Sequence, residues 1–202
     1  MEEIKLFGKY GYDNLEVRDA GLAQYISLKT VRYPHTFARH GNKQFAKGKV
    51  NVVERLINKL MRGGTGEKLG GRIIRTHAKL QGKKTKVIKM VKNAFVEIEG
   101  RTKQNPIQVL IRAIENCAPR EDITRVRYGG VSYQVSVDMS PQRRLDVSLR
   151  NIALAAIISS FNNKLTLEGA LANEIVLASA NDPNSYSIKR KNEAERMARS
   201  AR

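Results

Sequence analysis

The stretch from Arg125 to Arg144, RVRYGGVSYQVSVDMSPQRR, constrains the fold more than any other part of the sequence. Apolar and polar residues alternate on both sides of Gly129-Gly130, which is typical of two β-strands joined by a tight turn. The two glycines tolerate the positive φ angles that a two-residue hairpin turn needs. Because a lone two-stranded ribbon is only marginally stable in water, we expect this hairpin, at about residues 124–138, to lie against a partner.

Much of the chain outside this hairpin carries helical periodicity. Apolar residues recur at spacings of three and four residues in six stretches, which predict helices starting near residues 51, 86, 106, 146, 167 and 188. Asn105 followed by Pro106 is a typical helix start, with a capping side chain and a proline in the first turn. The pattern predicts a mainly α protein, a bundle of about six helices with one protruding two-stranded β-hairpin.

Three parts of the chain are expected from these patterns. Residues 1–50 have little periodicity and are expected to form an extended N-terminal extension, basic from about residue 31. Residues 51–182 form the helical domain that carries the hairpin, and residues 183–202 form a basic C-terminal helix. The glycine-rich stretch after residue 62 is interpreted as a flexible basic connection with a short helix around Leu69–Leu80. It lacks the Gly-Lys-Ser/Thr ending of a phosphate-binding loop, so no nucleotide site is expected.

Positive charge is concentrated in about one third of the chain. The net charge is +18, and residues 31–92 hold 17 Lys/Arg against two Asp/Glu, whereas residues 1–30 are net −1 and residues 93–202 net +4. A block of this kind attracts polyanions, with nucleic acid the first candidate and an anionic membrane the second. The apolar stripe of the terminal helix is mostly alanine, so no membrane binding is expected. Aromatic rings between the bases of residues 31–50 suit stacking on RNA and packing on the domain equally.

No arrangement of residues in the sequence indicates catalysis. The single cysteine, Cys117, has no nearby histidine in the sequence to activate it, and we interpret it as a buried structural residue. His35, His40 and His77 are too scattered for a metal cluster, so we expect no enzyme, metal or cofactor. One cysteine and the absence of a signal-peptide pattern at the N-terminus favour a cytoplasmic protein.

Three stretches in order carry a resemblance to a known family: QNPIQVLIRAIENCAPREDITRVRYGG, VDMSPQRRLD and NSYSIKRKNEAERMARSAR. They closely resemble the small-subunit ribosomal protein seven family, in its archaeal or eukaryotic branch, whose eukaryotic member is called protein five. The resemblance extends from about Tyr33 to Arg202. The basic insert LGGRIIRTHAKLQGKKTK is similar to the archaeal form.

The resemblance implies a helical protein with a β-ribbon arm and a structural role in the small ribosomal subunit in the cytoplasm. Family members bind the 3′ major domain of the small-subunit rRNA and help to nucleate assembly of the subunit head. Their hairpin and terminal helix lie near the exit-site tRNA and the path by which mRNA leaves. The implied partners are therefore rRNA, neighbouring ribosomal proteins and, close by, tRNA and mRNA, with no self-oligomer.

The expected RNA-binding residues come from two sources. Matching the family's motifs implicates a basic segment (Lys43, Lys47, Lys49), the hairpin (Arg125, Arg127, Tyr128, Gly129, Gly130, Arg143, Arg144) and the terminal helix (Tyr186, Lys189, Arg190, Lys191, Arg196, Arg199). Basic character alone adds Arg32, Arg72, Arg75, Lys83, Lys84, Lys86 and Arg120. Arginine suits such contacts because its guanidinium can donate two parallel hydrogen bonds to a phosphate.

A sequence-specific DNA-binding regulator is the alternative, with a helix-turn-helix among the central helices. Short helices and basic charge support it. The spread of basic residues over extension, hairpin and tail counts against it, because such a regulator concentrates its contacts on one recognition helix.

Overall fold

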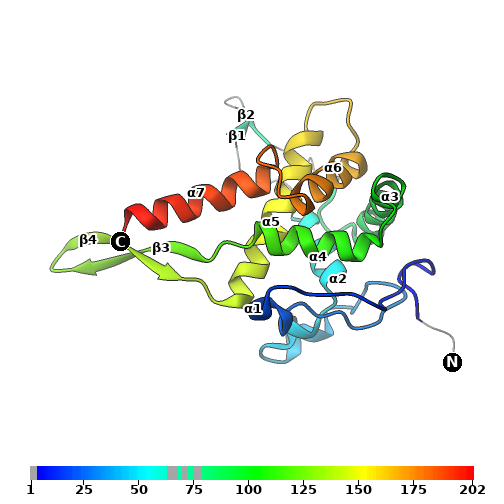
Figure 1. The fold of residues 1–202 in the computed structure, drawn as a ribbon, viewed down its shortest axis with the longest axis horizontal. Coiled ribbons are helices and arrows are strands. Elements are labelled where there is room, and N and C mark those ends of the chain that lie inside the picture. The colour runs from blue at the N-terminus through cyan, green and yellow to red at the C-terminus, as the bar shows by residue number, and fades with distance from the viewer. Residues whose placement is uncertain (1–3, 63–67, 70–71, 75–78) are drawn as a thin grey trace.

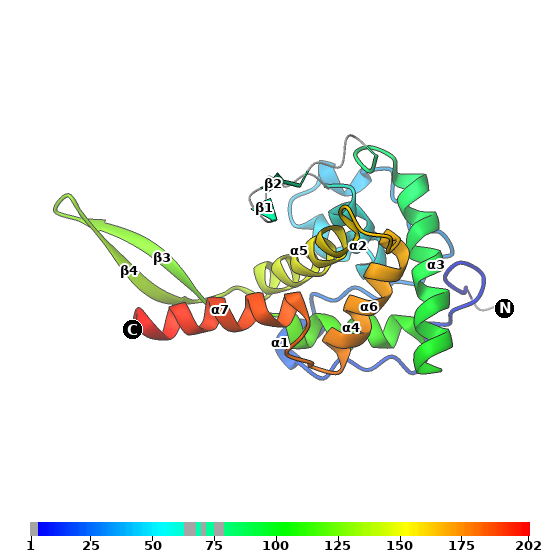
Figure 2. The ribbon, with the colours of Figure 1, turned by 90° about the horizontal axis from the view of Figure 1, so that it is seen from above.

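The structure is a computed structural model that describes residues 4–62, 68–69, 72–74 and 79–202. Within these residues the chain forms seven α-helices and two antiparallel two-stranded ribbons. The helices are α1 (Ala20–Ala23), α2 (Val52–Leu60), α3 (Lys84–Thr102), α4 (Pro106–Cys117), α5 (Pro141–Ser160), α6 (Leu167–Ser179) and α7 (Tyr186–Ser200). The strands are β1 (Lys68–Leu69), β2 (Arg72–Ile73), β3 (Glu121–Tyr128) and β4 (Val131–Asp138). The β3–β4 hairpin and α7 project together from one side of the helical body (Figures 1 and 2). The predicted mainly α bundle with one protruding hairpin is confirmed.

Side-chain caps begin five of the helices, including α1, where the Asp19 carboxylate accepts from the backbone N–H of Gly21. The oxygens of Asn51, Asn105, Thr166 and Ser185 accept hydrogen bonds from backbone N–H groups in the first turns of α2, α4, α6 and α7, respectively. Such a cap satisfies a donor that would otherwise lack a partner at the helix start. The predicted starts of α2, α4 and α6 are therefore confirmed by their caps.

The core lies where α3, α4, α5 and α6 pack together, with α2 against α5. Every residue of the predicted apolar stripe of α3 is buried, namely Val87, Val91, Ala94, Phe95 and Ile98. The stripes expected for α2 and α4 are buried as well. Helical periodicity therefore identified these core faces correctly.

The N-terminal segment covers the bundle instead of standing away from it. Leu6 and Leu22 are fully buried in the core, and the rings of Phe7 and Tyr10 lie edge-on to Phe95, with ring centroids 6.2 and 6.1 Å away. Beyond α1, its described part contains only the 3₁₀ turns η1 (Arg39–Asn42) and η2 (Ala46–Lys49). Packing, not regular secondary structure, holds it in place.

The hairpin has the predicted turn. Tyr128 pairs with Val131, and Gly129 and Gly130 between them have φ angles of 57° and 82°. Positive φ at both central residues matches the right-handed twist of the strands. The backbone N–H of Ser136 donates to the carbonyl of Ala201 at 3.4 Å, so the end of α7 lies against the base of the hairpin. This partner covers only the base.

α5 begins five residues earlier than the expected start at Asp146. Ser140 precedes Pro141 at its first turn, which is the same sequence signal as Asn105-Pro106. The prediction was wrong at this boundary because the apolar stripe begins later than the helix. Arg143 and Arg144 therefore lie on a helix and not on the ribbon.

The expected short helix around Leu69–Leu80 is wrong for the residues that the structure describes. Lys68–Leu69 pairs antiparallel with Arg72–Ile73, and Ile74 and Lys79 follow outside any helix. Glycine is unfavourable within a helix, and two glycines stand between the paired residues in the sequence. Arg75 lies outside the described residues.

Candidate nucleic-acid interface

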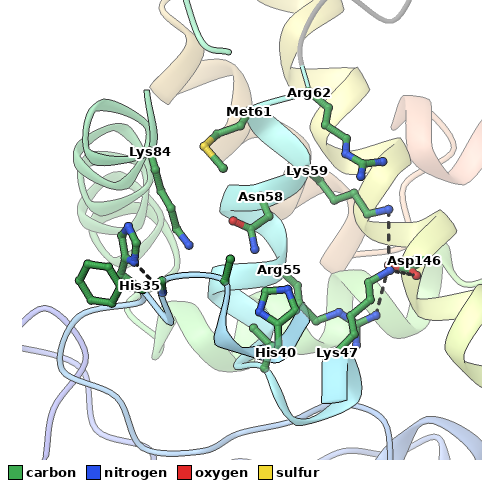
Figure 3. Close-up of a pocket in the computed structure, with 13 residues that line it drawn as sticks. His35, His40, Lys47, Arg55, Asn58, Lys59, Met61, Arg62, Lys84 and Asp146 are labelled. Carbon is green, nitrogen blue, oxygen red and sulfur yellow. Dashed lines mark hydrogen bonds and ion pairs between the residues drawn. The ribbon is translucent and has the colours of Figure 1, made fainter. Parts of the chain in front are cut away.

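A basic hollow opens between α2, α5, the start of α3 and residues 35–50. It has a volume of about 580 Å³, and the residues in Figure 3 line it. A second hollow of about 330 Å³ shares Lys59 and Arg62 with the first and adds Arg150. We call the two joined hollows the basic groove. Five lysines and arginines line the first hollow, together with one acidic residue, Asp146.

Asp146 accepts contacts from three cations in this groove. Lys47 contacts one carboxylate oxygen, while Arg55 Nη2 lies 3.2 Å and Lys59 Nζ 3.4 Å from the other. Burial alone would raise the pKa of Asp146, but the hydrogen bond from Lys47 and the charges of Lys59, Arg55 and Lys47 outweigh it, so the pKa lies below its usual value. The carboxylate is therefore ionised at neutral pH.

Glu54 on α2 provides a second carboxylate close to the groove, and this one is buried, with only 1% of its surface exposed. It accepts hydrogen bonds from the backbone N–H and hydroxyl of Thr36, both at 2.9 Å, and from Lys84 Nζ at 2.6 Å. Burial opposes ionisation, yet these donors lower the pKa of Glu54 below its usual value. Glu54 thus holds residues 31–50 against α2 and α3.

Several expected RNA-binding residues lie at or beside this groove. Lys47 and Lys84 line it, but Lys84 is mostly covered through its ion pair with Glu54. Lys43, Lys49, Lys83 and Lys86 are exposed, and Arg32 is exposed beside a separate hollow that Lys89 and Lys92 also line. Arg72 lies in β2. The cations expected between residues 32 and 86 therefore do not form one cluster.

Sequence reasoning missed Lys59, Arg62 and Arg150. Lys59 and Arg62 lie on and just after α2, on the side away from its apolar stripe, and Arg150 lies on the exposed side of α5. Reading the polar face of each predicted helix as well as its apolar face would have marked Lys59 and Arg62. The meeting of α2 with α5, which brings Arg150 to them, has no local signal.

The hairpin presents two different faces along its exposed length. Arg125 and Arg127 are exposed on one face and have no ion-pair partner among the described residues. The other face carries the apolar and aromatic side chains Val126, Tyr128, Val131, Tyr133, Val135 and Val137, which are 40–81% exposed. The ribbon thus offers guanidinium donors on one side and rings for stacking on the other.

Arg143 and Arg144 have different surroundings at the base of the hairpin. The Arg143 side chain is 65% exposed and pairs with Asp122 at 2.9 Å. The Arg144 side chain is 12% exposed, pairs with Asp19 at 2.7 Å, and donates to the carbonyl of Pro119 at 3.2 Å. Arg144 therefore joins the N-terminal segment to α5 and to the loop after α4.

Helix α7 is held at its first turn by a buried carboxylate. Glu174 on α6 accepts hydrogen bonds from the Ser185 hydroxyl, the Ser187 hydroxyl and the Ser187 backbone N–H, at 2.7, 2.7 and 3.0 Å. Further along, Lys189, Arg190, Arg196 and Arg199 are exposed, and Lys191 is half-buried. The Tyr186 hydroxyl accepts from Arg190 Nε at 2.9 Å.

A polar hollow of about 350 Å³ lies between the side chains of α7 and the start of the hairpin. Arg120, Glu121, Lys191, Glu195 and Arg199 line it, and Glu195 accepts from the backbone N–H of Arg120 at 3.2 Å. The exposed side chain of Arg120 therefore lies beside the cations of α7. This arrangement joins the basic surfaces of the hairpin base and the terminal helix.

The described residues show no catalytic arrangement. Burial and then the charge of Glu174 raise the pKa of the Cys117 thiol to about 12, so it is not a reactive thiolate. Among the described parts of the chain, no three His, Cys, Asp or Glu side chains are grouped so as to hold a metal ion. Within the same residues, every helix is too short or too polar to span a bilayer.

Comparisons with known proteins give a consistent result. A family model described as ribosomal protein S7p/S5e matches residues 22–202. The chain is 48% identical over 196 residues to the small ribosomal subunit protein uS7 of the archaeon Methanothermobacter thermautotrophicus, and the match covers 97% of this chain and 98% of the relative. The chain therefore belongs to the ribosomal protein S7p/S5e family, whose members are structural proteins and not enzymes.

Proposed function

We propose that this chain binds the 3′ major domain of the small-subunit rRNA and helps to nucleate assembly of the subunit head. Its hairpin and α7 then lie beside the exit-site tRNA and the mRNA exit path. Family membership and the small-subunit relative support a structural role in the small ribosomal subunit of the cytoplasm. Neighbouring ribosomal proteins complete its surroundings, and no self-association is needed.

The observation that carries the proposal is the presence of basic surfaces with three different shapes on one protein. The basic groove is concave, the hairpin is a thin ribbon, and α7 is a single helix that extends from the body (Figure 2). Folded RNA offers phosphates at many angles, so such surfaces can follow it by shape. A DNA regulator would instead concentrate its contacts on one helix in the major groove.

Phosphate contacts supply affinity in this proposal. Lysines and arginines that neutralise phosphates release counterions, which makes binding strongly dependent on salt. The exposed Arg125, Arg127, Arg196 and Arg199 can each donate to a phosphate without first giving up an ion pair within the described chain. No chemical step by the protein is required.

Crosslinking and sequencing of the RNA bound in cells tests the proposal directly. Reads concentrated in the 3′ domain of the small-subunit rRNA are expected, with separate crosslinks from the groove, the hairpin and α7. Reads scattered over unrelated transcripts would contradict it. Competition with duplex DNA then decides whether the DNA-binding alternative replaces it.

A further inference from the structure

We propose that Asp146 is an internal anion that positions the cations of the basic groove for RNA phosphates, so that removing its negative charge weakens RNA binding. This inference rests on the proposed function, because it assumes that the groove receives RNA. Net charge alone predicts the opposite effect on RNA affinity. Neutralising an acid in a basic surface should strengthen the attraction of a polyanion.

The contacts of Asp146 join three parts of the chain. Lys47 comes from η2, and Arg55 and Lys59 come from α2, while Asp146 itself lies in the second turn of α5. All three cations turn toward the carboxylate in Figure 3. Without it, nothing else among the described acids pairs with Lys47 or Lys59, so their side chains would lose a fixed direction.

Repulsion within the groove makes this anion necessary. Burial lowers the pKa of Lys59, and the charges of Lys47 and Arg62 lower it further, whereas Asp146 raises it. Loss of the carboxylate would therefore favour the neutral form of Lys59 and push Lys47 away from it. Asp146 therefore offsets the repulsion between these cations and keeps them close together.

The exposed fractions show which cations can reach a ligand. The Arg55 side chain is only 3% exposed, so it supports the carboxylate from inside, whereas Lys47 is 49% and Lys59 18% exposed. A lysine ammonium has three donors, and Asp146 occupies one direction. Lys47 and Lys59 can thus remain paired with Asp146 while they donate to a phosphate in the groove.

Glu54 differs from Asp146 in what it holds. Two of its three donors belong to Thr36, so it fixes the backbone of residues 31–50. The side chains that pair with Asp146 are instead all cations of the groove. Asp146 is therefore a positioning residue for the binding surface, whereas Glu54 stabilises the fold by holding residues 31–50 in place.

The test compares two variants that change the net charge equally. Asp146→Asn removes the anion but keeps the shape and an oxygen that can accept from Arg55. Glu16→Gln is the matched control, because its exposed carboxylate has no bonding partner among the described residues. The probe is a transcript of the 3′ major domain of archaeal small-subunit rRNA, titrated at several salt concentrations.

We expect Asp146→Asn to bind the transcript roughly fivefold more weakly, with a salt slope shallower by about 0.7–0.9 for each phosphate that the groove no longer neutralises. Glu16→Gln should bind as tightly as the unchanged protein or slightly more tightly. Asp146→Glu, which retains the charge, should recover most of the binding. Equal or tighter binding by Asp146→Asn than by Glu16→Gln would overturn the inference.

A double-mutant cycle separates positioning from general stability. Lys47→Met with Lys59→Met removes the cations on which Asp146 acts, so adding Asp146→Asn should cause no further loss of affinity. Urea unfolding of each variant at the temperature of the binding assay checks that all of them are folded during the titrations. A full fivefold loss in that background would show that Asp146 does not act through these lysines.

The same variants distinguish failure of the proposed function from failure of the inference about Asp146. If Lys47→Met with Lys59→Met leaves affinity and salt slope unchanged, the groove does not contact RNA, and the proposed function is wrong at this surface. If that pair weakens binding while Asp146→Asn strengthens it, only the role of Asp146 is wrong.

Discussion

The basic groove and the hairpin are both cationic, but their cations are held differently. In the groove, Lys47, Arg55 and Lys59 converge on one carboxylate between packed helices. On the hairpin, Arg125 and Arg127 extend into solvent, and the apolar face behind them is exposed along its length. The groove is therefore preorganised, whereas much of the ribbon lacks a folding partner within the described chain.

If the proposed function holds, this difference gives the protein two modes of RNA binding. A preorganised surface loses little side-chain freedom on binding, so its position on the RNA can be set early. A ribbon that is ordered by its surroundings adapts to them and contributes less to the stability of the isolated protein. Under the proposed function, the groove would serve initial attachment to rRNA, and the hairpin would serve contacts made in the assembled particle.

Replacing Glu54 should have the largest effect on the free energy of unfolding. Glu54→Ala leaves Lys84 without its buried partner and Thr36 without an acceptor, so we expect a loss of about 3 kcal/mol. Urea unfolding measures it, with Glu16→Ala as an exposed control expected to change stability by less than about 0.5 kcal/mol. Equal losses in the free energy of unfolding for the two variants would mean that the buried Glu54 carboxylate does not stabilise the residues around the groove.

The two arginines at the hairpin base should separate in the same assay. Arg144→Ala removes the bonds to Asp19 and to the carbonyl of Pro119, and we expect it to lower the free energy of unfolding by about 2 kcal/mol. Arg143→Ala breaks an exposed pair and should cost less than about 0.5 kcal/mol. In RNA titrations the order should reverse, with the salt slope changed only by Arg143→Ala. A large slope change from Arg144→Ala at constant stability contradicts this division.

Lowering the pH should reduce the stability that the carboxylates at the groove contribute, independently of the hairpin. The folded-state pKa values of Glu54 and Asp146 lie below their usual values of 4.5 and 3.8, so each carboxylate contributes stability above those values that is lost as pH falls toward the folded pKa. Unfolding measured from pH 7 downward should show this loss below about pH 4.5. A variant lacking residues 124–135 should retain it, whereas Glu54→Gln with Asp146→Asn should show a shallower decline. An unchanged decline in that pair would assign the acid sensitivity to other groups.

The smallest effect on stability is expected from the hairpin arginines. Arg125→Ala with Arg127→Ala should leave the free energy of unfolding within about 0.5 kcal/mol of the unchanged protein, because neither side chain is packed. If both contact phosphates, the salt slope for the rRNA transcript should fall by about 1.4–1.8. Ser132→Ala with Gln134→Ala, on the same face, is the uncharged control. A comparable fall in the salt slope of the control would contradict the assignment of phosphate contacts to Arg125 and Arg127.

Local signals in the sequence were sufficient for the elements that depend on neighbours along the chain. The starts of α2 near residue 51 and of α6 near residue 167, the cap Asn105 and the Gly129-Gly130 turn were predicted correctly, because each depends on contacts only a few residues away. The missed start of α5 had such a signal in Ser140-Pro141. The small β1–β2 ribbon had one in the glycines between its strands.

The sequence by itself therefore determined the helical class, the core stripes, the hairpin and the family resemblance that the comparisons confirmed. Only the tertiary structure decided which cations are free and which are paired. Asp146 meets Lys47 from 99 and Arg55 from 91 positions away, and Asp19 covers Arg144 from 125 positions away. Pairings over such separations depend on how helices pack, and residue spacing along one element carries no record of that packing.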